Sequence, residues 1–273
     1  MGRLLAKMKF SLRTNRKRIE SGFKPKPGHR QRRDQQFQNV TRTRRCFERT
    51  RLPVISIDCK KKEKVGCFKN SGKTWRREPE QVYDHDFLTD ALGTAAPYGI
   101  YDVQRNTGMV IVGTSRETPA FAADAVEQWW RTEGVRYYPD ADRLLILADC
   151  GGGNSARSRV WKKDLQFKLC NRHRLNVTVC HYPPGASKWN PIEHKLFSAI
   201  SNNWQGVPLD DYETVLKYIR TTKTKPGLKV TAKLSSKQYQ TGEKVPNKIM
   251  TTLRCHPHKK LPQWNYTIKP QQA

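Results

Sequence analysis

The sequence lacks the features that would assign it to several common classes of protein. It has seven cysteines, an odd number, and no CxxC pair among them, so neither a disulfide framework nor a paired-cysteine metal site is indicated. No apolar run approaches the roughly 20 residues of a transmembrane helix. Residues 1–12 are basic and carry no apolar segment typical of a signal peptide. These absences disfavour secreted and membrane proteins and favour reduced cysteines in a cytoplasm.

Acidic residues are scarce relative to basic ones. The chain has 52 Lys and Arg against 24 Asp and Glu, a formal net charge of +28. Such an excess repels itself unless a polyanion is bound, and nucleic acid is the usual partner. A ribosomal-type protein or a basic surface without a specific partner are the alternatives. An anionic membrane is a weaker one, because no basic amphipathic helix with a long apolar face is present.

The chain changes character near Pro53. Residues 1–52 are strongly basic, with a segment rich in Pro, Gly and charge over 22–33 that indicates a linker, and with apolar residues at helical spacing between Leu4 and Leu12 that predict a short helix. From Pro53 on, strand-like apolar runs alternate with helical periodicity. We therefore predict an arm and linker over 1–52, a main domain over 53–225, and a basic extension over 226–273 that packs on it.

The pattern after Pro53 predicts an α/β sandwich with a mixed sheet. Strands and helices alternate in the second half, after an initial group of strands. The predicted strands are Pro53–Asp58, Lys64–Asn70, Tyr98–Asp102, Gly108–Gly113, Arg143–Asp149, Asn176–His181 and Lys229–Leu234; the predicted helices are Thr118–Arg131, Ser158–His173, Pro191–Trp204 and 210–221.

Acids stand at two strand ends and at one helix start. Asp58 follows the run VISI, Asp149 follows LLILA, and Glu193 lies in the first turn of the helix that begins at Pro191. Functional groups gather at the carboxyl ends of strands in α/β sheets, and grouped carboxylates suit Mg²⁺ or Mn²⁺. The alternative is structural, because strand-end Asp often caps a turn and early Glu complements the helix dipole.

Short motifs flank two of these acids. Gly151 to Gly153 follow Asp149 and would let the backbone pass close to a phosphate or a metal, or simply form a flexible turn. The segment before Glu193 contains a Pro-Pro-Gly bend at 183–185 and Asn190, which could cap the helix. Both motifs fit a site built from loops at one edge of a sheet.

Five sequence blocks, taken together and in order, resemble the Rhodopirellula-type DDE transposases, which bacterial insertion sequences encode and which are related more distantly to the mariner group. The blocks are ISIDCKKKEKVGCFKNSGKTW (56–75), PYGIYDVQRNTGMVIVG (97–113), LLILADCGGGNSARSRVWK (144–162), CHYPPGASKWNPIEHKLFSAIS (180–201) and WNYTI (264–268). The resemblance implies an RNase H-like fold, cleavage and joining of DNA strands, and dependence on Mg²⁺ or Mn²⁺. It matches Asp58, Asp149 and Glu193 with the three catalytic, metal-binding acids.

The resemblance also sets expectations for partners. DNA at the element ends and at the target would be bound, with a possible homodimer, in the bacterial cytoplasm near the nucleoid. Family members carry a helix-turn-helix region, of which residues 3–17 resemble only the close, so we expect an amino-terminally truncated chain. A nuclease of the same fold and a non-catalytic DNA-binding remnant are the alternatives. Candidate DNA contacts are Lys60, Lys61, Lys62, Arg157, Lys188, Trp189, Asn190 and His194.

Overall fold

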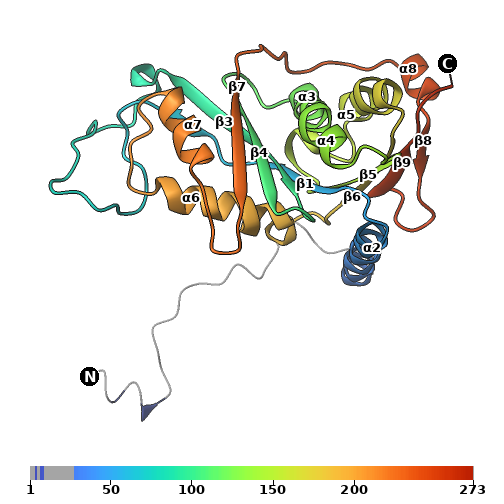
Figure 1. The fold of residues 1–273 in the computed structure, drawn as a ribbon, viewed down its shortest axis with the longest axis horizontal. Coiled ribbons are helices and arrows are strands. Elements are labelled where there is room, and N and C mark those ends of the chain that lie inside the picture. Colours follow the sequence, from blue (N-terminus) through green and yellow to red (C-terminus); the bar gives the residue numbers. More distant parts are fainter. Residues whose placement is uncertain (1–3, 5–6, 9–27, 273) are drawn as a thin grey trace.

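The structure is a computed structural model that describes Leu4, Lys7, Met8 and residues 28–272. The short helix predicted between Leu4 and Leu12 therefore lies largely outside the described residues. Within 28–272 the strands form a nine-stranded mixed sheet in the order β7-β4-β3-β1-β5-β6-β9-β8, with β2 paired to β3 (Figure 1). The strands are β1 (Val54–Cys59), β2 (Glu63–Val65), β3 (Gly93–Asp102), β4 (Thr107–Gly113), β5 (Arg143–Ala148), β6 (Asn176–His181), β7 (Lys229–Ser235), β8 (Cys255–Pro257) and β9 (Asn265–Ile268).

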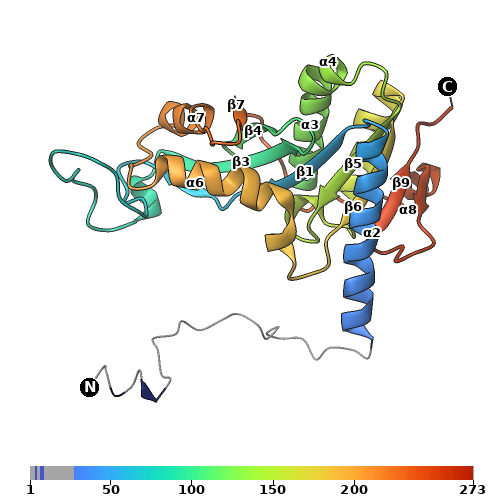
Figure 2. The same cartoon turned by 60° about the horizontal axis from the view of Figure 1, so that its bottom comes forward.

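Helices cover both faces of this sheet, as the predicted sandwich requires (Figure 2). The first face carries α3 (Pro119–Trp129), α4 (Val135–Tyr137) and α5 (Arg159–Asp164). The second carries α2 (His29–Arg49), α6 (Ser198–Trp204) and α7 (Tyr212–Arg220), while α8 (Asn247–Thr252) lies in the carboxyl-terminal segment. Three π-helical segments, Trp130–Gly134, Leu165–Asn171 and Glu193–Phe197, adjoin α3, α5 and α6.

The apolar runs behave as central strands should. In β1, Ile55 and Ile57 pack against α3 and α5, whereas Val54 packs with α2 on the other face. In β5, Ile146 and Leu147 are divided between the same two faces. Strands buried on both sides need continuous apolar runs rather than alternation, which is why these two were visible in the sequence.

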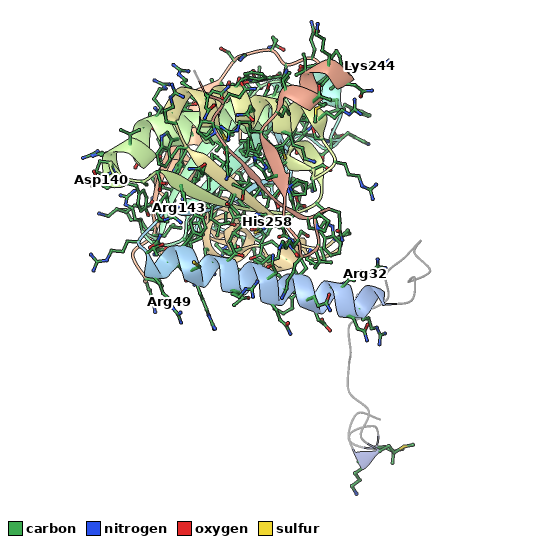
Figure 3. The ribbon with its side chains drawn as sticks, turned by 90° about the vertical axis from the view of Figure 1, so that its right-hand side faces the viewer. Arg32, Arg49, Asp140, Arg143, Lys244 and His258 are labelled. Carbon is green, nitrogen blue, oxygen red and sulfur yellow. The ribbon has the colours of Figure 1, made fainter. Side chains whose placement is uncertain are left out.

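Two predicted elements differ from the observed ones. The strand predicted over Lys64–Asn70 is only Glu63–Val65, because the chain turns at Gly66, whose φ of 145° is unfavourable for other residues. Part of the range assigned to a basic arm and linker, His29–Arg49, is the 21-residue helix α2. Figure 3 shows α2 lying along the body, with Arg32 near one end and Arg49 near the other.

Both terminal regions contact the central sheet. Helix α2 buries Val40 and Phe47 against β1 and β5. At the other end of the chain, β7 pairs in parallel with β4, and β9 pairs with β6. The division at 52 and 225 stays a prediction, but the segments on either side share one sheet and its covering helices. No helix in the described part of the chain is long and apolar enough to cross a bilayer.

Candidate active site

Two of the predicted acids leave neighbouring parallel strands at the same edge of the sheet. Strands β1 and β5 pair in parallel from Val54–Leu145 to Ser56–Leu147. Asp58 lies two residues beyond the last pair on β1, and Asp149 follows the end of β5. The two strands are therefore adjacent, which brings both half-buried side chains to the carboxyl ends of β1 and β5.

A buried hydrogen-bond cluster holds the helix of the third acid against β1. The Ser56 hydroxyl donates to Asn190 Oδ1 at 2.5 Å, and Asn190 Nδ2 donates to the Ile57 carbonyl at 2.9 Å. The Ile192 amide then donates to Ser56 Oγ at 3.0 Å. Glu193 follows directly, at the start of a π-helical segment, a geometry frequent at functional sites.

The three carboxyl groups interact electrostatically. Burial first, and then repulsion from Asp149, raises the pKa of Asp58 well above its usual range. Burial also raises the pKa of Asp149 and of Glu193, and interaction with the neighbouring Asp58 carboxyl partly offsets the rise at Glu193. Mutual repulsion among buried carboxylates favours a shared proton or a bound cation. The structure thus brings together all three acids that the sequence singled out.

The turn after β5 orients Asp149. Its Oδ1 accepts hydrogen bonds from the Gly151 amide at 3.1 Å and from Asn154 Nδ2 at 3.3 Å. Its backbone carbonyl accepts from His181 Nδ1 at 2.8 Å. Main-chain and side-chain atoms of the acid are therefore both fixed, as expected of a ligand held ready for a cation.

A series of hydrogen-bonded, buried side chains extends from the Asp149 carbonyl. Because a carbonyl only accepts, His181 carries its proton on Nδ1, and its Nε2 accepts from the Tyr266 hydroxyl at 3.1 Å. The same hydroxyl oxygen accepts from Trp161 Nε1 at 2.9 Å. Burial lowers the pKa of His181 to about 4, so the ring is neutral near pH 7. No local sequence pattern indicates this series of hydrogen bonds, because its members lie on β6, β9 and α5.

A fourth acid, Glu117, also approaches the site. Its Oε1 accepts from the Gly153 amide at 3.3 Å, and its charge contributes to the raised pKa values of Asp58 and Asp149. Glu117 follows no apolar run, since it lies in the turn between β4 and α3. The search for acids at strand ends therefore missed it.

The side chains at this edge of the sheet are suitable ligands for divalent metal ions. The carboxylate oxygens grouped at this edge are hard ligands of the kind that Mg²⁺ and Mn²⁺ prefer. A buried polar atom without a hydrogen-bond partner, the Tyr98 hydroxyl, lies among the same acids. In residues 28–272, however, no three His, Cys, Asp or Glu side chains already surround one point as ligands. The carboxyl groups would have to converge when a cation binds.

The predicted DNA contacts divide into two groups. Six of the eight side chains are exposed: Lys61, Lys62, Arg157, Lys188, Trp189 and His194. Asn190 is 0% exposed and makes the hydrogen bonds described above, so the prediction that it contacts DNA is wrong. Lys60 is mostly buried, pairs with Glu63 at 2.7 Å and lies 4.6 Å from the centre of the Trp204 ring, which leaves it little freedom to reach a phosphate.

Comparisons with known proteins agree with this geometry. A family described as the Rhodopirellula transposase DDE domain matches residues 1–270. The Mos1 transposase paired-end complex with left transposon end is similar in fold, with a TM-score of 0.51 and 13% identity over 80% of this chain and 60% of that one. This likeness confirms the predicted RNase H-like sheet.

Two further Mos1 structures match more weakly. A pre-cleavage Mos1 transpososome has a TM-score of 0.47 and 12% identity, and the Mos1 mariner paired-end complex with Mn has 0.46 and 14%; both matches cover 80% of this chain. The chain spans 60% of the length of each Mos1 chain. No match is found among curated proteins.

Proposed function

The chain belongs to the Rhodopirellula transposase DDE-domain family, and from this premise we propose that it catalyses metal-dependent cleavage and joining of DNA strands during transposition of an insertion sequence. The observation that carries the proposal is the meeting of Asp58, Asp149 and Glu193 at one sheet edge. We assign these three residues as the catalytic acids and as ligands of Mg²⁺ or Mn²⁺.

The acids are divided between rigid elements, which suits a site that must hold its geometry. Asp58 is on β1, Asp149 is fixed by the turn that follows β5, and Glu193 is tied to β1 through Asn190 and Ser56. Divalent ions held by these acids would supply activation of the attacking hydroxyl and stabilisation of the leaving oxygen. The residues themselves orient the ions and keep their own carboxylates in place.

DNA is the proposed partner, both at the element ends and at the target. The six exposed candidate residues around the acids would contact phosphates and, through Trp189, a base. Trp189 is 56% exposed, and its other side lies against Phe37 of α2 at 6.0 Å between ring centres. We propose that a homodimer of this chain brings two DNA ends together; the similar Mos1 transposase structure is a paired-end complex with left transposon end. Action on DNA would place the chain at the bacterial nucleoid.

The test is strand transfer by the full chain. A duplex carrying the element end with a free 3′ hydroxyl is incubated with a plasmid and Mg²⁺ or Mn²⁺, and joined products are counted. We expect joining by the parent protein, loss of at least about a hundredfold in Asp149→Asn, and no loss in Asp142→Asn. Asp142 is the matched control, because it is exposed at the opposite end of β5.

The same assay separates the alternatives. Hydrolysis that depends on Asp149 without any joining would favour an RNase H-like nuclease. DNA binding that survives Asp149→Asn, together with no cleavage by the parent protein, would favour a non-catalytic remnant. Either result would overturn the proposed function.

A further inference from the structure

Glu117 approaches the acids from the face of the sheet opposite Glu193. Cys59 pairs with Tyr98 across β1 and β3, and Asp58 pairs with Gly99. Neighbouring residues of a strand point to opposite faces, so Cys59 and Tyr98 face α3, whereas Asp58 faces the helix of Glu193. The charge of Glu117 contributes to the raised pKa of the Cys59 thiol, so this carboxylate lies near Cys59, on the α3 side.

The start of α3 fixes Glu117 in this position. The next residue, Thr118, caps the helix, since its side chain accepts a hydrogen bond from the Phe121 amide at 3.2 Å. Thr118 is only 3% exposed, so the main chain beside Glu117 has little freedom. The acid is therefore held at the end of a buried helix cap rather than on a free loop.

The glycine turn after Asp149 packs closely against Glu117 and Thr118. A Cβ on Gly152 would lie 2.6 Å from Glu117 Oε1, and a Cβ on Gly153 would lie 2.8 Å from the Thr118 carbonyl oxygen. Both distances are shorter than real contacts allow, so a larger residue at Gly152 would displace the Glu117 carboxylate, and one at Gly153 would clash with the main chain. In this turn the Gly151 amide donates to the Asp149 carboxylate and the Gly153 amide donates to the Glu117 carboxylate.

Two buried polar atoms beside this pair of acids have no hydrogen-bond partner. They are the Tyr98 hydroxyl and Asn154 Oδ1, and both residues are 0% exposed. Asn154 Oδ1 and Glu117 Oε1 flank the same point, at 3.9 and 2.6 Å from where a Gly152 Cβ would stand. An unpaired buried polar atom destabilises the folded protein, so oxygens of this kind beside two carboxylates indicate a position for an electropositive partner.

We propose that Glu117 is a fourth carboxylate of the metal site and that, with Asp149 and Asn154 Oδ1, it forms a cation position on the α3 side of the sheet edge. Asp58 would lie between this position and the one that Glu193 serves. The inference rests on the proposed function and deepens it, because it assigns one of two ions to residues outside the Asp58, Asp149 and Glu193 set.

Glu117 could instead have only a structural role as the acceptor for the Gly153 amide. Glu117→Gln separates the two roles, because glutamine keeps the accepting oxygen and loses the charge. A structural role predicts unchanged Mn²⁺ binding. The metal role predicts weaker Mn²⁺ binding together with equal or higher stability of the metal-free protein, since one repelling charge beside Asp58 and Asp149 is removed.

The experiment measures binding of Mn²⁺ alone to the full chain, by calorimetry and by the electron paramagnetic resonance signal of free Mn²⁺, with thermal melting alongside. The parent protein should bind two ions. Glu117→Gln should retain one and bind the other at least about tenfold more weakly. Tyr98→Phe should melt no lower than the parent without metal. The matched control is Glu213→Gln, a 78% exposed acid on α7, which should behave as the parent.

The outcomes distinguish this inference from the function on which it rests. Parent-like Mn²⁺ binding by Glu117→Gln, with loss of binding in Asp149→Asn, would overturn the fourth ligand and leave the proposed function intact. A parent protein that binds no Mn²⁺ at all would overturn both. A metal-free Glu117→Gln protein that melts below the metal-free parent would show that the carboxylate has a structural role and would also overturn the inference.

Discussion

Asn190 provides the sharpest test of how the third acid is positioned. Its side chain makes two buried hydrogen bonds, to the Ser56 hydroxyl at 2.5 Å and to the Ile57 carbonyl at 2.9 Å. Asn190→Ala removes both, so the Ser56 hydroxyl loses the acceptor for its proton and the Ile57 carbonyl loses a side-chain donor. With about 1 kcal/mol for each lost bond and a further 1 kcal/mol or more for the groups that lose these partners, we expect destabilisation of about 3 kcal/mol.

The effect should extend to the site. Parallel pairing of β1 with β5 ends at Ser56, and Asn190 bonds to the carbonyl of the next residue on β1. Without Asn190, the helix that begins with Glu193 loses its tie to the strand of Asp58. We therefore expect Mn²⁺ affinity to fall by about tenfold or more in the variant, the usual scale for losing a group that supports a ligand.

The assay is urea unfolding followed by tryptophan fluorescence, for Asn190→Ala, Ser56→Ala and the double variant. Because the two side chains bond to each other, the double-mutant cycle should give a coupling energy of about 1–2 kcal/mol. The reasoning would be refuted by an Asn190→Ala protein of parent stability and parent Mn²⁺ affinity that binds DNA less tightly. That result would restore the DNA contact first predicted from the sequence.

Three further outcomes follow from the same geometry. Burial lowers the pKa of His181 to about 4 in the folded protein, whereas its value in the unfolded chain is about 6.5. The free energy of unfolding is therefore highest above pH 6.5 and decreases as the pH falls toward 4, because the unfolded chain then binds the proton more tightly. The decrease amounts to about 3 kcal/mol; a His181→Gln protein should have a flatter pH profile in urea unfolding, and a parallel profile would disprove the assignment. Gly152→Ala should lose about 1–2 kcal/mol, because φ is +57° there, and a melting temperature equal to the parent's would contradict the close approach. Lys61→Ala with Lys62→Ala should reduce the slope of log affinity for DNA against log salt by about 2, and an unchanged slope would place both lysines away from the DNA.

The sequence was informative where burial alone determines structure. β1 and β5 are central and covered on both faces, so continuous apolar runs marked them, and an acid at the end of each run was readily seen. Helix α2 was missed for the converse reason. Of the residues that it buries, Gln36 and Asn39 are polar, so its inward face lacks the apolar repeat by which helices are recognised.

Asn190 was assigned the wrong role because its partner is remote in sequence. Ser56 lies 134 positions earlier, and only the folded sheet brings them together. A polar residue beside a catalytic acid in a loop is compatible with substrate contact or with internal bonding, and the local sequence is the same in both cases. Burial decides between them, and burial of a loop residue depends on tertiary packing.

For the glycine turn after Asp149, the sequence correctly predicted a close approach of the backbone, but not the group that it approaches. Three successive glycines predicted close approach of the backbone to a phosphate or a metal. The close approach is present, but at Gly152 and Gly153 it is to the Glu117 carboxylate and the Thr118 carbonyl. A turn without side chains indicates that another segment packs closely against it. The sequence offers one such segment, the helix start Thr118-Pro119, which Glu117 directly precedes. Pairing those two local signals, rather than searching strand ends for acids, is the route by which Glu117 could have been found.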